Sequence, residues 1–176
     1  MEPLNYQWLH FIIKEMTHKR IAQKLVRMVR EEQRLQLSID DFNKKTKKNS
    51  NELNLIIKKI GWPNIEKVGK QGAEAAWLIA QHSDGDINFQ KRCLKLIEKE
   101  IEKNAIPRHY FAYLYDRICI NLGKTQLYGT QLKNKPNLNI VPYPIRLRSK
   151  LNERRRLYNL PPLDVYIKLF KQFNNK

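Results

Sequence analysis

Apolar residues recur every three or four positions along most of the chain, which is the spacing of one face of an α-helix. The first such stripe contains Leu4, Trp8, Phe11, Ile12 and Met16. Isolated amphipathic stripes usually face a core, so we expect this N-terminal helix to pack on the domain. The alternative is an arm that binds a partner or touches a membrane.

A second stripe predicts a helix over residues 18–36, and its apolar members are Ile21, Leu25, Met28 and Leu35. Glu32 falls on the same face, four residues after Met28. A carboxylate at such a position must be paired, half exposed or functional. We expect the ordinary outcome, which is pairing with Arg or Lys at the surface.

The polar, basic segment over residues 40–52 is either a loop or a solvated helix face. Asn49, with Glu52 three residues later, resembles a capping box that would start a short helix. Gly61 is a natural end for that helix, because glycine readily takes the C-terminal capping conformation.

Further helices are predicted after a structured loop. The helix over residues 72–82 is rich in small residues and should be central and buried, and a turn then leads to a helix over 87–103. Pro107 opens the next helix and Gly123 ends it. Prolines make residues 124–145 a loop or short hairpin, and Pro161 and Pro162 split the tail into two helices.

These elements predict a mainly α fold: a single-domain helical bundle of about six to seven helices, with a short irregular or β-hairpin segment near 124–145. Residues 1–19 are interpreted as an N-terminal helical extension and residues 20–176 as one helical domain. A chain of 176 residues suits one domain, and 41% hydrophobic and 29% charged residues suit a globular one.

The formal net charge is +17, which favours nucleic acid, anionic membrane surfaces or acidic partners, although it also simply keeps a protein soluble. No stretch reaches the roughly 20 apolar residues of a membrane span, and the first residues make a poor signal peptide. Cys93 and Cys119 lack metal or redox spacing and should be buried thiols. We therefore expect a cytoplasmic protein; the sequence does not indicate its oligomeric state.

The run from His82 to Asp86 places a histidine beside two carboxylates, Asp84 and Asp86. Histidine titrates near neutral pH, so His82 is a candidate general base that a carboxylate would orient. Asp116 completes the candidate catalytic set. The same groups would hold Mg²⁺, Mn²⁺ or Fe²⁺ if Glu32 or Asp116 joined them. The run alone is a weak metal signal, so we predict no metal ligand, and no cofactor is indicated.

Each of these residues also has an ordinary structural role. A histidine at a helix end caps it, an aspartate in a turn N-caps the next helix, and a charged residue within a helix forms a buried ion pair. Other polar residues are suited to bind a small polar, anionic or amide-bearing ligand through neutral donors or guanidinium groups. These candidates are Gln90, Arg117, Gln126, Tyr128, Gln131, Arg154 and Arg155.

No Walker A loop, GxGxxG, GxSxG, HExxH or zinc-finger spacing occurs. The strings GAEAAWLIAQHSDGDINFQ, AYLYDRICINLGKTQLYGTQ and NERRRLYNLPPLDVY instead resemble the bacterial family catalogued as domain of unknown function 6624. The likeness extends from about residue 20 to the C-terminus. It implies a shared site but no reaction. The family elements map onto His82, Asp84, Asp86, Phe89, Gln90, Asp116, Arg117, Gln126, Tyr128, Gly129, Thr130 and Gln131.

Three functions remain open. The first is a small helical enzyme, a hydrolase or group-transfer catalyst, with His82 as acid and base. The second is an interaction protein whose polar cluster is a buried structural network, and the third is a basic nucleic-acid-binding module. The enzyme hypothesis predicts that His82, Asp116 and Gln126 line one cleft, because catalytic groups must reach one substrate.

Overall fold

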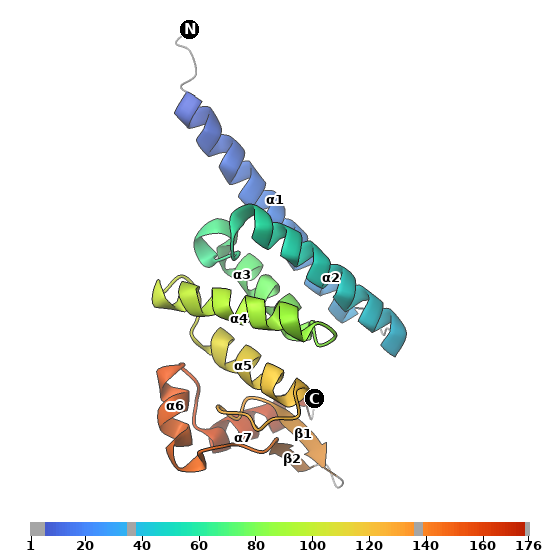
Figure 1. Ribbon diagram of the computed structural model, residues 1–176, viewed down its shortest axis with the longest axis vertical. Coiled ribbons are helices and arrows are strands. Elements are labelled where there is room, and N and C mark those ends of the chain that lie inside the picture. The colour runs from blue at the N-terminus through green and yellow to red at the C-terminus, as the bar shows by residue number, and fades with distance from the viewer. Residues whose placement is uncertain (1–5, 35–37, 136–138, 175–176) are drawn as a thin grey trace. The chain divides into compact units, whose positions relative to one another are not determined.

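The computed structural model describes residues 6–34, 38–135 and 139–174. Within these ranges the chain forms seven α-helices and a two-stranded antiparallel hairpin, which confirms the mainly α prediction (Figure 1). Two compact units are present, Met1–Gly85 and Asp86–Lys176. This division does not test whether residues 20–176 form one domain, so that remains a prediction. Leu4 and Leu35 lie outside the described residues.

The first unit contains α1 (Tyr6–Arg34), α2 (Ile39–Ile60) and α3 (Ile65–His82), and each of the three packs on the other two (Figure 1). α1 is one continuous helix, so the predicted separation near residue 17 is wrong. The physical reason is that no glycine or proline interrupts the helix over its 29 residues.

The expectation that the first apolar stripe packs on the domain is also wrong. Trp8, Phe11 and Met16 remain 54%, 60% and 52% exposed. The second stripe does face the core, where Leu25 is fully buried and Met28 nearly so. One helix thus carries an exposed apolar part followed by a packed part.

α2 begins earlier than predicted, because Ser38 caps it by accepting a hydrogen bond from the Asp41 backbone N–H at 3.1 Å. The basic segment is therefore helical rather than a loop, and no helix starts at Asn49. Asn49 and Ser50 instead turn into the unit and are buried. Gly61 ends the helix as expected.

The predicted central helix is α3, which Asn64 caps at its N-terminus and which ends at His82. Its Ala73, Ala76 and Ala80 are fully buried, as their small size predicts for a closely packed helix.

The second unit contains α4 (Ile87–Glu102) and α5 (His109–Asn121), which pack on each other. The predicted hairpin is β1 (Leu132–Lys135) and β2 (Asn139–Pro142), with Leu132 opposite Pro142. A short 3₁₀ helix (Arg148–Lys150) leads into α6 (Leu151–Leu157), and α7 (Leu163–Asn174) follows the two prolines. Of the helices in the described part of the chain, none combines the length and apolarity needed to cross a membrane.

Candidate functional site

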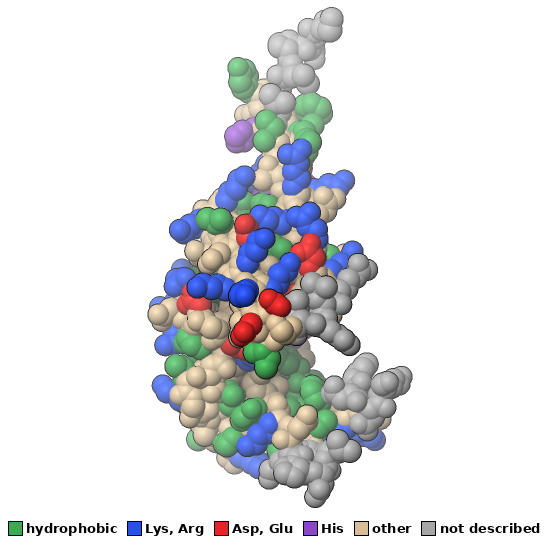
Figure 2. Space-filling view, turned by 90° about the vertical axis from the view of Figure 1, so that its right-hand side faces the viewer, with side chains coloured by type: hydrophobic (Ala, Val, Ile, Leu, Met, Phe, Trp, Pro, Cys, Tyr) green, Lys and Arg blue, Asp and Glu red, His purple; other side chains and the backbone are tan. Residues whose placement is uncertain are grey.

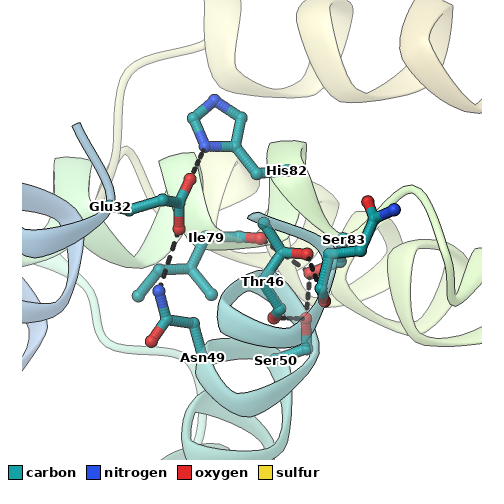
Figure 3. A network of polar contacts seen from close by, with 8 residues as sticks. Glu32, Thr46, Asn49, Ser50, Ile79, His82 and Ser83 are labelled. Atoms are coloured by element: carbon teal, nitrogen blue, oxygen red, sulfur yellow. Dashed lines mark hydrogen bonds and ion pairs between the residues drawn. The ribbon is translucent and has the colours of Figure 1, made fainter. Parts of the chain in front are cut away.

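The candidate site in the first unit is built around His82, at the last position of α3, and Glu32, in the last turn of α1. Nδ1 of His82 is hydrogen-bonded to Oε1 of Glu32 (Figure 3). The Glu32 side chain is only 2% exposed, whereas that of His82 is 29% exposed. The buried member is thus the carboxylate, and the imidazole extends from it toward the surface.

Asn49 of α2 fixes the other oxygen of this carboxylate. Its Nδ2 donates to Oε2 of Glu32 at 2.9 Å (Figure 3). An ionised carboxylate only accepts hydrogen bonds, so a neutral His82 must carry its proton on Nδ1 and present a free lone pair on Nε2. Figure 3 shows Nε2 pointing away from Glu32. The predicted Arg or Lys partner of Glu32 is therefore wrong: its partners are a histidine and an amide.

A second polar contact joins α2 to the residue that follows His82. The hydroxyls of Ser50 and Ser83 lie 2.6 Å apart, and both are buried (Figure 3). Ser50 also reaches the Thr46 carbonyl, and Ser83 the Ile79 carbonyl, each at 2.7 Å. These contacts anchor the C-terminal end of α3, and with it the backbone of His82.

The two aspartates after His82 lie in the turn between α3 and α4. Asp86 N-caps α4, where its Oδ1 accepts from the Phe89 backbone N–H at 2.8 Å, as one of the expected roles had it. Asp84 lies exposed in the turn. The hydrogen bond at Nδ1 of the histidine comes from Glu32, fifty positions earlier in the chain.

Asp116 forms the centre of a different network, in the second unit. Its carboxylate is fully buried and accepts hydrogen bonds from the backbone N–H groups of Leu127, Tyr128 and Thr130 at 2.7–3.1 Å. The Thr130 hydroxyl donates to it at 3.0 Å. Burial raises the pKa of Asp116, while these donors oppose the rise by stabilising the ionised form.

The side chain of Gln126 bonds to the main chain beside the loop of residues 127–130, whose N–H groups bond to Asp116. Its Nε2 donates to the carbonyls of Gln131 and Tyr143 at 3.0 and 2.8 Å, and its Oε1 accepts from the Gln131 N–H at 2.9 Å. The side chain is fully buried. The amide therefore uses both its donor and its acceptor on the main chain.

Arg155 of α6 approaches this loop from the other side and is also fully buried. Its Nη1 donates to the carbonyls of Tyr128 and Gly129 at 2.6 and 3.3 Å, and its Nε to that of Pro161 at 2.6 Å. Its guanidinium carbon lies 5.0 Å from the centre of the Tyr166 ring. Burial lowers its pKa. Among the described residues, Nη2 has no hydrogen-bond partner.

Tyr128 belongs to an aromatic cluster rather than to an open surface. Its ring meets Tyr158 edge-on at 4.8 Å and Tyr115 at 5.8 Å, and Phe111 stacks on Tyr158 at 5.5 Å. Burial is the main cause that raises the pKa of Tyr128, and this phenol is protonated near neutral pH. The cluster packs one side of the loop that Asp116 holds.

The remaining predicted binding residues lie around the same loop, except for Gln90, which lies within α4. Arg117 donates to Gln131 at 3.4 Å, and Arg154 donates to the carbonyls of Leu127 and Leu147 at 3.2 and 2.8 Å. Gln90 is fully buried and accepts from Asn121 at 3.4 Å. The second unit therefore brings most of the predicted binding residues together.

The predicted residues thus divide between two networks, one in each unit. His82 belongs to the first unit, and Asp116 and Gln126 to the second, so their meeting at one cleft remains a prediction. Among the described residues, no three His, Cys, Asp or Glu side chains are grouped closely enough to hold a metal ion.

Sequence reasoning missed Asn49 and did not identify Glu32 as the partner of His82. One signal was present for each residue. Glu32 interrupts an apolar stripe, and Asn49 lies one helical turn before the buried Leu53. Both indicate a polar side chain facing the interior, but neither tells which residue it meets there.

The comparisons with known proteins agree with the expected resemblance. A model described as "Family of unknown function (DUF6624)" matches residues 17–175. The match starts within α1, just after the exposed apolar residues of that helix. No curated protein and no solved structure matches the chain.

Proposed function

Starting from the fact that the chain belongs to the DUF6624 family, whose function is unknown, we propose that it is a small enzyme in which His82 transfers protons. One observation carries this proposal: the buried Glu32 carboxylate orients a histidine whose own side chain is partly exposed. A buried carboxylate that fixes the tautomer of an accessible imidazole is the arrangement that general acid–base catalysis needs.

In this proposal Nε2 of His82 accepts a proton from an attacking water or hydroxyl group. The resulting imidazolium keeps its Nδ1–H on Glu32, whose negative charge stabilises it, and Asn49 holds the carboxylate in place. His82 then returns the proton from Nε2 to the leaving group. The protein ends in its starting state, and the reaction is hydrolysis or group transfer on a polar, anionic or amide-bearing substrate.

We propose a structural role for the network in the second unit. The support is that Asp116, Gln126 and Arg155 are fully buried and direct their hydrogen bonds mainly to the main chain of one loop. This corresponds to the alternative of a buried structural polar network, confined to one unit. Binding of nucleic acid by the +17 chain remains a prediction, and a steep loss of affinity with salt would test it.

The enzyme proposal is tested with His82→Gln, which keeps a hydrogen-bonding group of similar reach but does not titrate near neutral pH. Hydrolysis of p-nitrophenyl acetate and p-nitrophenyl phosphate is measured, together with thermal stabilisation by nucleotides, sugars and amino-acid amides. We expect a rate loss of roughly 10²–10⁴-fold with the fold intact. The control is His10→Gln, at an exposed histidine of α1. Equal rates in wild type and His82→Gln, or no turnover and no stabilisation at all, would contradict the proposal.

A further inference from the structure

Part of the apolar stripe of α1 lies opposite the packed face of the helix. Met16 precedes the fully buried Leu25 by nine positions, and at about 100° per residue these two side chains point in opposite directions. Ile21 and Met28 lie on the side of Leu25 and are buried. Met16 and Ile13 therefore cannot continue the packed face, although the helix is continuous. Phe11, fourteen positions before Leu25, lies on the packed side but is still 60% exposed.

This geometry leaves a group of large apolar side chains uncovered in the first unit. The exposed members, with exposures of 52–91%, are Tyr6, Trp8, Phe11, Ile13 and Met16. We call them the apolar tip of α1. In Figure 1 the start of α1 extends beyond the other two helices of its unit, and Figure 2 shows hydrophobic side chains on this projecting end. Contiguous exposed apolar patches mark interaction sites.

The same side of the helix becomes basic beyond the apolar tip. Arg20 follows Met16 by four positions and Arg27 by eleven, both of which are same-face spacings, and Lys19 and Arg30 adjoin them. All four are exposed. α1 as a whole carries seven Lys and Arg against three Glu. One outward face thus joins an apolar, aromatic end to a cationic stretch.

We propose that the apolar tip of α1 binds the surface of an anionic phospholipid bilayer. Tyr6 and Trp8 suit the membrane–water boundary, the other apolar side chains enter the outer acyl region, and the basic face lies against the lipid phosphates. The helix would lie on the membrane rather than cross it, in keeping with the absence of a spanning helix among the described residues.

Charge decides between a membrane and a second copy of the chain. Two copies that paired through this face would bring together basic stretches of molecules that each carry a net charge of +17. An anionic bilayer instead attracts that charge. The family match starts at residue 17, so the apolar tip lies outside the shared part of the chain. A segment outside the family match can attach the protein to a surface without altering the site that the family shares.

The test is flotation of the full chain with vesicles of phosphatidylcholine alone and of phosphatidylcholine mixed with phosphatidylglycerol. Wild type should bind the mixed vesicles, less so at high salt, and should bind neutral vesicles weakly. The double variant Trp8→Ser/Phe11→Ser should lose binding by about tenfold or more, because both apolar side chains leave the bilayer. Lys19→Gln/Arg20→Gln should reduce binding to mixed vesicles only.

A matched control is Leu55→Ser/Leu157→Ser, which removes two equally exposed apolar side chains elsewhere and should bind like wild type. The proposal is overturned if wild type does not float with anionic vesicles, if it binds neutral vesicles equally well, or if the Trp8 and Phe11 variant binds normally. Sedimentation gives the other outcome: a dimer that this variant abolishes, without lipid binding, would make the face a contact between copies.

Discussion

Glu32 and His82 lie fifty positions apart in the sequence, yet Nδ1 of His82 donates to the Glu32 carboxylate. The bond ties the last turn of α1 to the last residue of α3, and it decides which nitrogen of the neutral imidazole keeps a proton. Asn49 occupies the other carboxylate oxygen at 2.9 Å, so the direction of both hydrogen bonds is fixed. Changing the carboxylate to an amide therefore has a defined consequence.

We predict that Glu32→Gln reverses the tautomer of His82. The glutamine carbonyl can still accept from Asn49, and its amide nitrogen then faces Nδ1, which must become an acceptor. Nε2 gains the proton and can no longer act as a base. Because both hydrogen bonds survive, the free energy of unfolding should fall by only about 1 kcal/mol. The ¹⁵N chemical shifts of the His82 ring report the tautomer directly.

The control for this prediction is Glu31→Gln, one position earlier. Glu31 is exposed on the same helix and pairs with Lys45, so its change should leave the His82 ring signals unmoved. If Glu32→Gln kept the proton on Nδ1, the assignment of the carboxylate as the orienting group would be wrong.

A second prediction concerns the carboxylate of the second unit. Asp116→Asn replaces one acceptor oxygen by a donor that faces the N–H groups of the 127–130 loop. The N–H groups that lose their acceptor lower the free energy of unfolding, and removal of a buried charge offsets part of this loss. We expect a net decrease of roughly 1–3 kcal/mol. Chemical denaturation of the full chain measures this loss. Asp84→Asn, in an exposed turn, should change stability little; equal effects of the two substitutions would rule out the network as a stabilising element.

The fold was largely predictable because helical spacing, prolines and capping residues are local signals. α4, α5, α6, α7 and the hairpin all follow from such signals. α1 shows where this reasoning fails. An amphipathic stripe predicts that a face will be covered but does not identify what covers it, so the exposure of Trp8 and Phe11 was not foreseen. On one helix Met16 points away from the packed Leu25, but Phe11 lies on its side, so helical spacing alone does not decide the exposure of Phe11.

The site was less predictable because its contacts are distant in sequence. Proximity along the chain suggested Asp84 or Asp86 as the partner of His82, whereas the partner is supplied by another helix. Conversely, the strings around Asp116 and Gln126 were noticed because of their polarity. Their polar atoms prove to be directed at the backbone of a single loop, and sequence cannot distinguish such a use from ligand binding.

A third prediction uses two glycines of the second unit that share a positive φ of 69°, Gly123 and Gly129. The Cβ of alanine at Gly123 meets no atom within 4 Å. The substitution should therefore lower the free energy of unfolding by about 1–2 kcal/mol, through the strain of the left-handed backbone alone. Alanine at Gly129 would also lie 2.9 Å from Ile145 and 3.2 Å from Leu163. Ile145 is half-buried and can move, so the added cost should be about 1 kcal/mol, at the low end for overpacking. Thermal melts of the two variants give the difference, and equal melting temperatures would contradict close packing of the loop.

The last prediction concerns the buried thiol of Cys93 in α4. Burial raises its pKa from 9.0 to about 12, so at pH 9 the folded protein should contain roughly 10³-fold less Cys93 thiolate than the unfolded chain. The thiol's contribution to stability is therefore constant below about pH 9, and it is lost as the pH rises toward about 12, because only the unfolded chain ionises readily in that window.

In Cys119→Ser, iodoacetamide should react with Cys93 at least about 10²-fold more slowly in buffer than in denaturant. Cys93→Ala, which retains the half-buried Cys119, should react faster in buffer. Rapid native labelling of Cys93 would mean that α4 is not packed as described.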